Sequence, residues 1–341
     1  MIVVMKPSSS REHVDNVVHL LADMGVDSHI IDGANQKVVE LLGVSARFNR
    51  ARLELAPMVD RVLERPEPLL AGGRLGGEAT AGTWAVPLGT RAVVGRRKLG
   101  IIAGPCSVES EDGLLRTADA VAEAGAVGLR GGAFKPRTSP YSFQGHEERG
   151  LEMLARAREK TGLAVVTEVM CCKHVERVQP YADVLQVGSR NMHNTPLLKT
   201  VGEQDKPVLL KRGWSATLEE FLLAAEYIVN AGNRNVMLCE RGIRAHEDYV
   251  RNTLALAVVP EVKRVSNLPI IVDPSHGTGR SHLVTPMSNA AIACGADGLL
   301  VEVHPDPAHA WSDGSQTLDL DQFRALMEGL KRFAEACDRE L

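Results

Sequence analysis

Short apolar runs alternate with amphipathic stretches from Leu99 to the end of the chain. The runs are rich in β-branched residues, which favours strands. They comprise residues 99–103, 126–129, 163–166, 183–187, 207–210, 235–238, 268–272 and 297–301. Between them, apolar residues recur at helical spacing, as at Leu114, Ala118 and Val121. Eight strands that alternate with helices over residues 98–341 predict an α/β fold, the (β/α)8 TIM barrel.

A doubly wound open sheet is the main alternative, because it also alternates parallel strands with helices. The segment that follows the first predicted strand reads Gly104-Pro105-Cys106 and carries no GxGxxG fingerprint. The sequence therefore favours the closed barrel.

The first part of the chain has a different pattern. Apolar runs typical of strands fall at residues 2–5, 28–31, 37–42 and 58–63, and helical spacing falls between the first two and at 49–55. Ser9 and Glu12 predict a capping box at the start of the first helix, and Gly25 predicts its end. The order βαββαβ predicts a small N-terminal ferredoxin-like α+β domain over residues 1–66.

Residues 67–97 are expected to connect this domain to the barrel. The segment 65–73, RPEPLLAGG, has the composition of a linker. Residues 83–94 are expected to form a hairpin that caps the barrel, which would then occupy residues 98–341.

The composition argues against a nucleic-acid-binding, membrane or secreted protein. The chain has 341 residues, of which 44% are hydrophobic, and a net charge of −4, so the sequence does not predict a broad basic surface for nucleic acid. We expect no membrane partner, because no uninterrupted apolar stretch is long enough to span a bilayer. The N-terminus does not resemble a signal peptide, and the six cysteines form no zinc-type CxxC pair. A cytoplasmic protein with reduced thiols is therefore expected.

Polar side chains follow nearly every predicted barrel strand. Because catalytic groups of such barrels lie at the carboxyl ends of the strands, these side chains are expected to share one site. One thiol, one imidazole and two carboxylates among them suit a divalent transition metal such as Mn, Fe, Co or Zn. The candidate ligands are Cys106, His276, Glu302 and Asp313. The alternative is that the cysteine is a small core residue and the histidine a hydrogen-bonded one.

Cations form the second group at the strand ends. Lys135 and Arg137 stand in a Gly- and Pro-shaped loop beside Thr138 and Ser139, a set of donors that suits phosphate oxygens. Further cations follow other strands, at Arg130, Arg190, Lys211 and Arg241. Six cations in one cleft would match two phosphates and a carboxylate. The alternative for each is a surface salt bridge.

Seven ordered blocks resemble the 3-deoxy-D-arabino-heptulosonate 7-phosphate (DAHP) synthases of the type I beta branch. The blocks are AGPCSVES, KPRTS, GSRNM, LLKRG, ERGIR, DPSHGTG and VEVHPDP, in this order. KPRTS separates the chain from the related 3-deoxy-manno-octulosonate 8-phosphate synthases, which typically carry a KANR-like block there. The N-terminal segment is similar to the regulatory domain of one subset of the branch. Ser189 and His193 depart from the alanine and glutamine common in the family.

The resemblance implies a metal-dependent condensation of phosphoenolpyruvate with erythrose 4-phosphate, the first step of the shikimate pathway. The implied metal ligands are Cys106, His276, Glu302 and Asp313, with Mn²⁺ the preferred ion and Fe²⁺, Co²⁺ and Zn²⁺ as alternatives. The implied phosphoenolpyruvate residues are Arg130, Lys135, Arg190, Lys211 and Arg241. Arg137, Thr138 and Ser139 would hold the phosphate of erythrose 4-phosphate, with Asp273 near its hydroxyls. The catalytic candidates are Lys211 as general acid, Glu168 to position water, and His276.

The resemblance also implies a homo-tetramer or dimer, with tyrosine or phenylalanine as a feedback effector bound by the N-terminal domain. That domain could instead serve only oligomerisation. Two other functions stay open: an octulosonate-type synthase that uses arabinose 5-phosphate, and a catalytically inactive barrel that acts as a ligand-binding regulator. KPRTS disfavours the first, and retention of all four candidate ligands disfavours the second.

Overall fold

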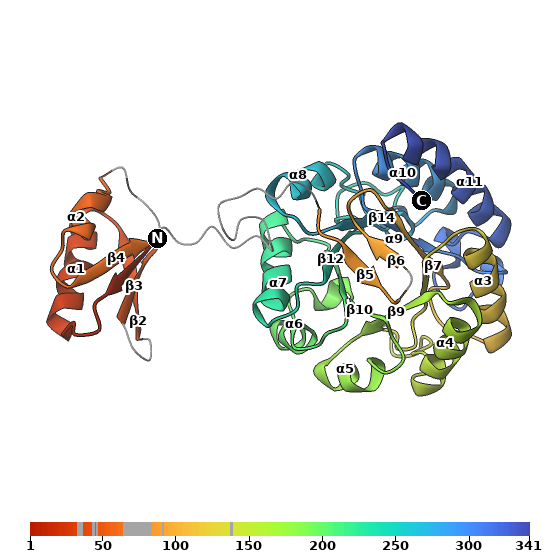
Figure 1. Cartoon of the computed structure of the whole chain (residues 1–341), viewed down its shortest axis with the longest axis horizontal. Helices are drawn as coiled ribbons and strands as arrows, with labels where there is room; N and C mark the ends of the chain where they lie inside the picture. Colours follow the sequence, from red (N-terminus) through yellow and green to blue (C-terminus); the bar gives the residue numbers. More distant parts are fainter. Residues whose placement is uncertain (33–36, 43–44, 46, 64–82, 91, 137–138) are drawn as a thin grey trace. The chain divides into compact units, whose positions relative to one another are not determined.

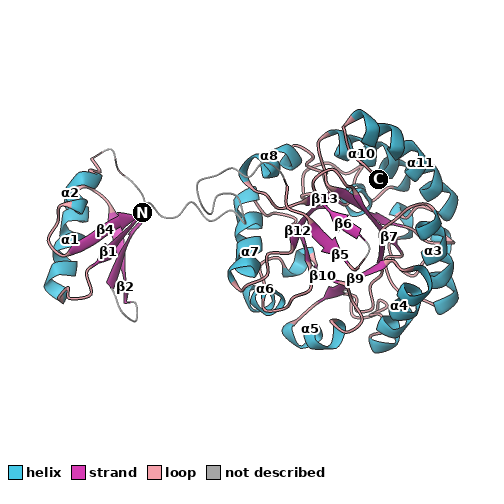
Figure 2. Ribbon diagram, viewed as in Figure 1, coloured by secondary structure: helices cyan, strands magenta, loops and turns pink. Residues whose placement is uncertain are grey.

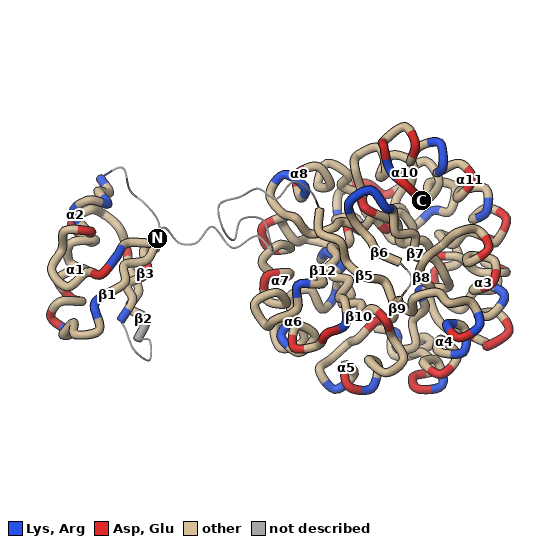
Figure 3. The backbone as a smooth tube through the Cα atoms, in the orientation of Figure 1, with Lys and Arg blue, Asp and Glu red and all other residues tan. Residues whose placement is uncertain are grey.

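The structure is a computed structural model that describes all residues except 33–36, 43–44, 46, 64–82, 91 and 137–138. The chain divides into two units, Met1–Leu69 and Leu70–Leu341 (Figure 1). The predicted linker segment 65–73 and the predicted boundary at residue 66 lie outside the described residues, as do Arg137 and Thr138. Charged residues of both signs are spread over the outer helices of the larger unit (Figure 3).

The first unit has the predicted ferredoxin-like order. Its elements are β1 (Ile2–Met5), α1 (Arg11–Asp23), β2 (Asp27–Asp32), β3 (Lys37–Leu42), α2 (Arg50–Glu54) and β4 (Val59–Leu63). The strands form one antiparallel sheet in the order β2-β3-β1-β4. Val14 and Leu21 of α1 pack with Val3, Val39 and Val62 of the sheet in a core of its own. Apolar residues of the strands and the apolar face of α1 therefore share one core.

The first helix starts one residue later than predicted. Ser10, not Ser9, is the N-cap of α1, and its hydroxyl accepts from the backbone N–H of His13 at 3.4 Å. The His13 ring completes the capping box by accepting from the Ser10 backbone N–H at 3.1 Å. Glu12 stands one position too early in the first turn to make this reciprocal bond. The predicted Ser9–Glu12 capping box is therefore wrong by one residue.

The second unit contains a closed barrel of eight parallel strands, ringed by helices (Figure 2). Its strands are β7 (Gly100–Gly104), β8 (Gly128–Arg130), β9 (Ala164–Val169), β10 (Val184–Val187), β11 (Val208–Lys211), β12 (Val236–Glu240), β13 (Ile270–Val272) and β14 (Gly298–Glu302). Each predicted apolar run overlaps one of them. The pairing of β14 with β7 closes the sheet, which confirms the barrel and excludes the open doubly wound alternative.

Helices follow the strands around the barrel. They are α3 (Glu111–Glu123), α4 (Glu148–Thr161), α5 (Cys172–Val178), α6 (Thr195–Gly202), α7 (Leu218–Asn230), α8 (Val258–Val265), α9 (Pro274–Thr278), α10 (Ser281–Ala293) and α11 (Leu320–Ala336). Short 3-10 turns lie at Ser189–Asn191, Pro307–His309 and Gly314–Gln316. Among the residues that the structure describes, no helix has the length and apolar character needed to cross a membrane.

A hairpin fills the amino-terminal end of the barrel. Strands β5 (Val86–Leu88) and β6 (Ala92–Val94) pair within the range predicted for a capping hairpin. Val86, Leu88 and Val94 are buried with residues that line the barrel interior. Val94 approaches Gly100 so closely that a Cβ there would lie 2.3 Å from its methyl group, so the first barrel strand must begin with glycine. With this end filled, the carboxyl ends of the strands remain for the site.

Candidate metal and anion site

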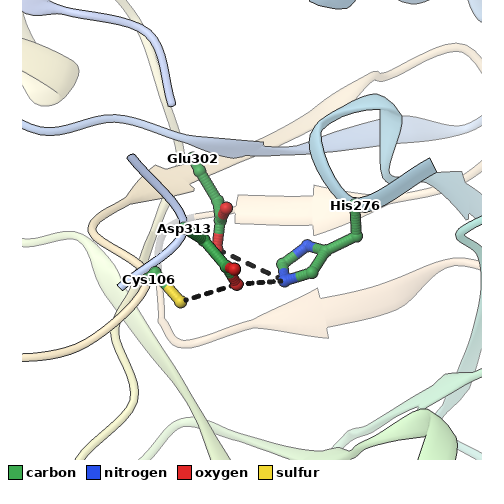
Figure 4. A group of neighbouring side chains, drawn as sticks. All are labelled: Cys106, His276, Glu302 and Asp313. Atoms are coloured by element: carbon green, nitrogen blue, oxygen red, sulfur yellow. Dashed lines mark hydrogen bonds and ion pairs between the residues drawn. The ribbon is translucent and has the colours of Figure 1, made fainter. Parts of the chain in front are cut away.

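Four donor side chains converge at the carboxyl ends of the strands (Figure 4). Cys106 follows β7, His276 lies on α9, Glu302 ends β14 and Asp313 lies in the loop after β14. Their ligand atoms all lie within 4.8 Å of one another. His276 Nε2 is 3.4 Å from Glu302 Oε1 and 3.7 Å from Asp313 Oδ2, and the Cys106 thiol donates to the same Asp313 oxygen at 3.3 Å. The structure therefore brings all four predicted ligands together.

Local structure holds two of these donors in place. Asp273 is the N-cap of α9 and accepts from the backbone N–H of His276 at 2.8 Å. The second oxygen of Asp273 lies 2.8 Å from Nδ1 of the His276 ring, which leaves Nε2 toward the other donors. Asp313 has a left-handed backbone (φ 53°), and the Thr317 hydroxyl donates to its carbonyl at 2.8 Å. Both donors are therefore set by short-range hydrogen bonds that the sequence encodes locally.

The protonation states suit a divalent cation. Burial, and next the charge of Glu302, raise the pKa of the Cys106 thiol to about 11, so the thiol would release a proton on binding a cation. Burial lowers the pKa of His276, which favours the neutral form of the ring that can act as a ligand. Burial raises the pKa of Asp313, but His276 and Arg251 outweigh it, so this pKa lies well below its usual range. The mixed sulfur, nitrogen and oxygen set fits a divalent transition metal.

Two predicted substrate residues also touch the donors. The Arg130 guanidinium donates to Glu302 Oε1 at 2.6 Å, and both side chains are buried. Lys135 Nζ donates to the thiol sulfur of Cys106 at 3.1 Å and to its carbonyl at 2.9 Å. These two cations balance charge at the donor cluster and at the same time line the neighbouring pocket. The metal donors and the anion pocket are therefore one site.

A pocket of about 290 Å³ lies beside the donors. Its walls include the predicted residues Arg130, Lys135, Ser139, Glu168, Arg190, Lys211, Arg241, His276 and Asp313. Nη1 of Arg241 is buried and has no hydrogen-bond partner within the described parts of the chain. Burial also lowers the pKa of Arg241, which means that the charge is poorly solvated. Such an arginine is suited to pair with a bound anion.

Asp273 is not among the residues that line this pocket in the described part of the chain. Its side chain is completely buried and accepts from Lys211 Nζ at 2.6 Å. Burial raises the pKa of Asp273, but His276 and Lys211 lower it well below its usual range, so the carboxylate is charged. Its oxygens lie against Lys211 and His276, so Asp273 can orient these two side chains, and its predicted place near the sugar hydroxyls stays a prediction.

Glu168 lies in the pocket wall, where Gln186 donates to its carboxylate at 3.3 Å. Gly188 leaves the room that this carboxylate occupies, since a Cβ at that position would lie 2.0 Å from Glu168 Oε1. Arg212 directly follows β11 and Glu240 ends β12, and the two form a buried ion pair at 2.8 Å. Neither is among the pocket-lining residues that the structure describes. Arg212 and Glu240 thus show that a charged residue at a strand end need not line the pocket.

The site predicted from the sequence did not include Trp214, an aromatic residue that lies among the arginines. Trp214 lies in the pocket wall, and the guanidinium carbons of Arg190, Arg241 and Arg244 lie 5.1, 5.9 and 5.5 Å from the centre of a Trp214 ring. The aromatic face attracts each cation and helps to keep three like charges in one place. Trp214 directly follows the block LLKRG, and Arg244 is the last residue of the block ERGIR, so the positions in and next to these blocks were the available signal.

Comparisons with known proteins identify the family of this chain. Residues 85–339 match the model of the DAHP synthetase I family, and residues 1–64 match the DAHP synthase ferredoxin-like domain. Phospho-2-dehydro-3-deoxyheptonate aldolase of Thermotoga maritima is 46% identical over 336 residues, which cover 98% of each chain.

A crystal structure of the Thermotoga maritima DAHP synthase superposes with a TM-score of 0.78 at 44% identity, and covers 99% of this chain and 98% of that one. A 2-dehydro-3-deoxyphosphooctonate aldolase of Alkalilimnicola ehrlichii is 33% identical over 253 residues, which cover 69% of this chain and 90% of the relative. The resemblance therefore extends through both domains for the heptonate aldolase. The chain belongs to the DAHP synthetase I family and carries the ferredoxin-like domain of DAHP synthases at its N-terminus.

Proposed function

We propose that this protein condenses phosphoenolpyruvate with erythrose 4-phosphate and water to give DAHP and inorganic phosphate, the first step of the shikimate pathway. The observation that supports the proposal most directly is that four candidate metal-donor side chains contact Arg130 and Lys135, which also line a cation-rich pocket. Membership of the DAHP synthetase I family supports the same reaction. Mn²⁺ is the proposed ion, with Fe²⁺, Co²⁺ and Zn²⁺ as alternatives.

The pocket residues divide between the two substrates in this proposal. Phosphoenolpyruvate carries a phosphate and a carboxylate, for which the pocket offers Arg130, Lys135, Arg190, Lys211 and Arg241. Ser139, with Arg137 and Thr138, would bind the phosphate of erythrose 4-phosphate. Guanidinium and ammonium groups suit these anions because they form charge-assisted hydrogen bonds.

The reaction requires one carbon–carbon bond, one added water and one lost phosphate. C3 of phosphoenolpyruvate attacks the aldehyde carbon, water adds at C2, and the resulting hemiketal phosphate collapses with release of phosphate. The chemistry that a divalent cation at the four donors would supply is Lewis-acid polarisation of the aldehyde. Lys211 is the proposed general acid for the aldehyde oxygen, and the Glu168 carboxylate would accept a hydrogen bond from the attacking water.

The aldehyde that the protein accepts distinguishes DAHP synthesis from the octulosonate reaction and from a non-catalytic role. Full-length protein should consume phosphoenolpyruvate and release phosphate with erythrose 4-phosphate, and not with arabinose 5-phosphate. Consumption with arabinose 5-phosphate alone would assign the chain to the octulosonate reaction. Absence of consumption with both aldehydes, at an excess of Mn²⁺, would favour a non-catalytic regulator.

We also propose that the N-terminal domain binds tyrosine or phenylalanine and restrains the barrel. A separate apolar core in this domain and its match to the ferredoxin-like domain of DAHP synthases support a distinct role. Deletion of residues 1–70 should leave turnover in place and remove inhibition by these amino acids. Steady-state assays of both proteins, with circular dichroism as a control for folding, check this. An intact enzyme that ignores all three aromatic amino acids would contradict it.

Two further properties belong to the proposal. A cytoplasmic location would keep the Cys106 thiol reduced and available as a ligand. A homo-oligomer, tetramer or dimer, is the proposed assembly.

A further inference from the structure

A buried glutamine joins the two carboxylates of the donor cluster. Gln316 is 1% exposed, and its side-chain amide donates to Glu302 Oε2 at 2.6 Å. Its amide oxygen accepts from the Arg251 guanidinium at 3.0 Å. The same guanidinium nitrogen donates to Asp313 Oδ1 at 3.2 Å. A continuous path of hydrogen bonds therefore runs from Glu302 through Gln316 and Arg251 to Asp313.

This bridge uses the oxygen of each carboxylate that does not face the other donors. Oε1 of Glu302 lies 3.4 Å from His276 Nε2, whereas Oε2 accepts from Gln316. Oδ2 of Asp313 accepts from the Cys106 thiol, whereas Oδ1 accepts from Arg251. The bridge thereby fixes the rotation of both carboxylates and turns one oxygen of each toward the centre of the cluster.

The bridge is also anchored to the helix that carries the histidine. The backbone N–H of Arg251 donates to the carbonyl of Thr278 at 2.8 Å. The neighbouring residue, Asn252, donates through its side chain to the carbonyl of His276 at 3.1 Å. Both acceptors lie on α9. Three donors from separate elements, His276, Glu302 and Asp313, are thus tied to one network, whereas Cys106 is held by Lys135.

We propose that Gln316 and Arg251 are positioning residues that set the geometry of the two carboxylates for a divalent cation. This inference rests on the metal role in the proposed function. An amide suits the central position because it donates to a carboxylate and accepts from a guanidinium without adding charge. Hydrogen-bond partners of metal ligands typically change affinity by about 10- to 100-fold when they are removed.

The test is the affinity of the full-length, substrate-free protein for Mn²⁺, measured by competition with a fluorescent chelator. Gln316→Leu should raise the Kd for Mn²⁺ by about 10- to 100-fold. Arg251→Leu should also raise the Kd. The double variant should raise the Kd by less than the product of the two single effects, because both residues act in one path. The matched control is Thr117→Val, which removes the hydrogen bond of a buried threonine to the Gly113 carbonyl within α3 and should leave the Kd unchanged.

The outcomes separate this inference from the proposed function. Wild-type affinity in both single variants would overturn the bridge and leave the proposed function standing. If circular dichroism shows that Gln316→Leu does not fold, the Kd of Arg251→Leu tests the bridge alone. This variant should fold, because the Arg251 side chain is 42% exposed. A wild-type protein that binds no Mn²⁺ would refute the metal role, and the bridge would fall with it.

Discussion

Cys106→Ser should lower both the affinity of the protein for Mn²⁺ and its turnover by more than about 100-fold. Loss of a residue that hydrogen-bonds to a metal ligand typically lowers metal affinity by about 10- to 100-fold, and loss of a proposed ligand itself should have a larger effect. A thiol can give up its proton to a bound cation, whereas a serine hydroxyl holds its proton far more tightly. Metal content by elemental analysis and steady-state turnover with both substrates check the expectation.

A second serine variant provides the control for Cys106→Ser. Cys294 caps the C-terminal end of α10 and is only partly buried, so Cys294→Ser should retain both metal and activity. Full metal content and normal turnover in Cys106→Ser would contradict the assignment of the donor cluster.

Lys211→Met should abolish most of the turnover and also destabilise the protein. Lys211 and Asp273 form an ion pair with side chains that are 5% and 0% exposed, and Asp273 in turn lies against His276. Removal of the lysine leaves a buried carboxylate with one partner fewer, which costs about 3–5 kcal/mol in comparable cases. Loss of the proposed general acid should lower kcat by a further ~10²- to 10⁴-fold. Chemical denaturation and steady-state kinetics measure the two effects.

Lys263→Met is the matched control for this variant. Lys263 on α8 pairs with Asp297 at 2.7 Å, and Asp297 is completely buried just before β14, at the amino end of the barrel. Asp297 also forms an ion pair with Arg339 at 2.9 Å, so its buried charge would still be paired in the absence of Lys263. Lys263→Met should therefore destabilise the protein less than Lys211→Met does, and it should leave kcat unchanged. Normal turnover in Lys211→Met would exclude Lys211 from the chemistry.

The barrel could be predicted from the sequence because its signal is repeated and local. Each buried parallel strand needs an apolar run, and the surrounding helices need one apolar face, so eight such units indicate one architecture. The start of α1 was harder to place, since Ser9 and Ser10 are both good N-caps. Only the backbone conformation shows that Ser10 takes that role, with His13 in place of Glu12.

The structure gathers the four candidate metal ligands, and five predicted cations line the adjoining pocket, but the contacts among these residues could not be predicted from the sequence. Lys211 and Arg212 are adjacent in sequence, yet Lys211 lines the pocket and Arg212 pairs with Glu240. Successive side chains of a strand point to opposite sides, so the choice between them depends on the register of the barrel. Gln316 and Arg251 were missed for a related reason: they act through hydrogen bonds between residues far apart in sequence, such as Arg251 and Asp313.

The most direct test of the proposed chemistry is consumption of phosphoenolpyruvate with erythrose 4-phosphate by the full-length protein, before and after treatment with EDTA. Activity should be lost with EDTA and return when Mn²⁺ is added in excess, because the proposed role of the donor cluster is to hold a cation that polarises the aldehyde. Undiminished activity in protein shown to be free of metal would contradict a metal-dependent condensation at this site.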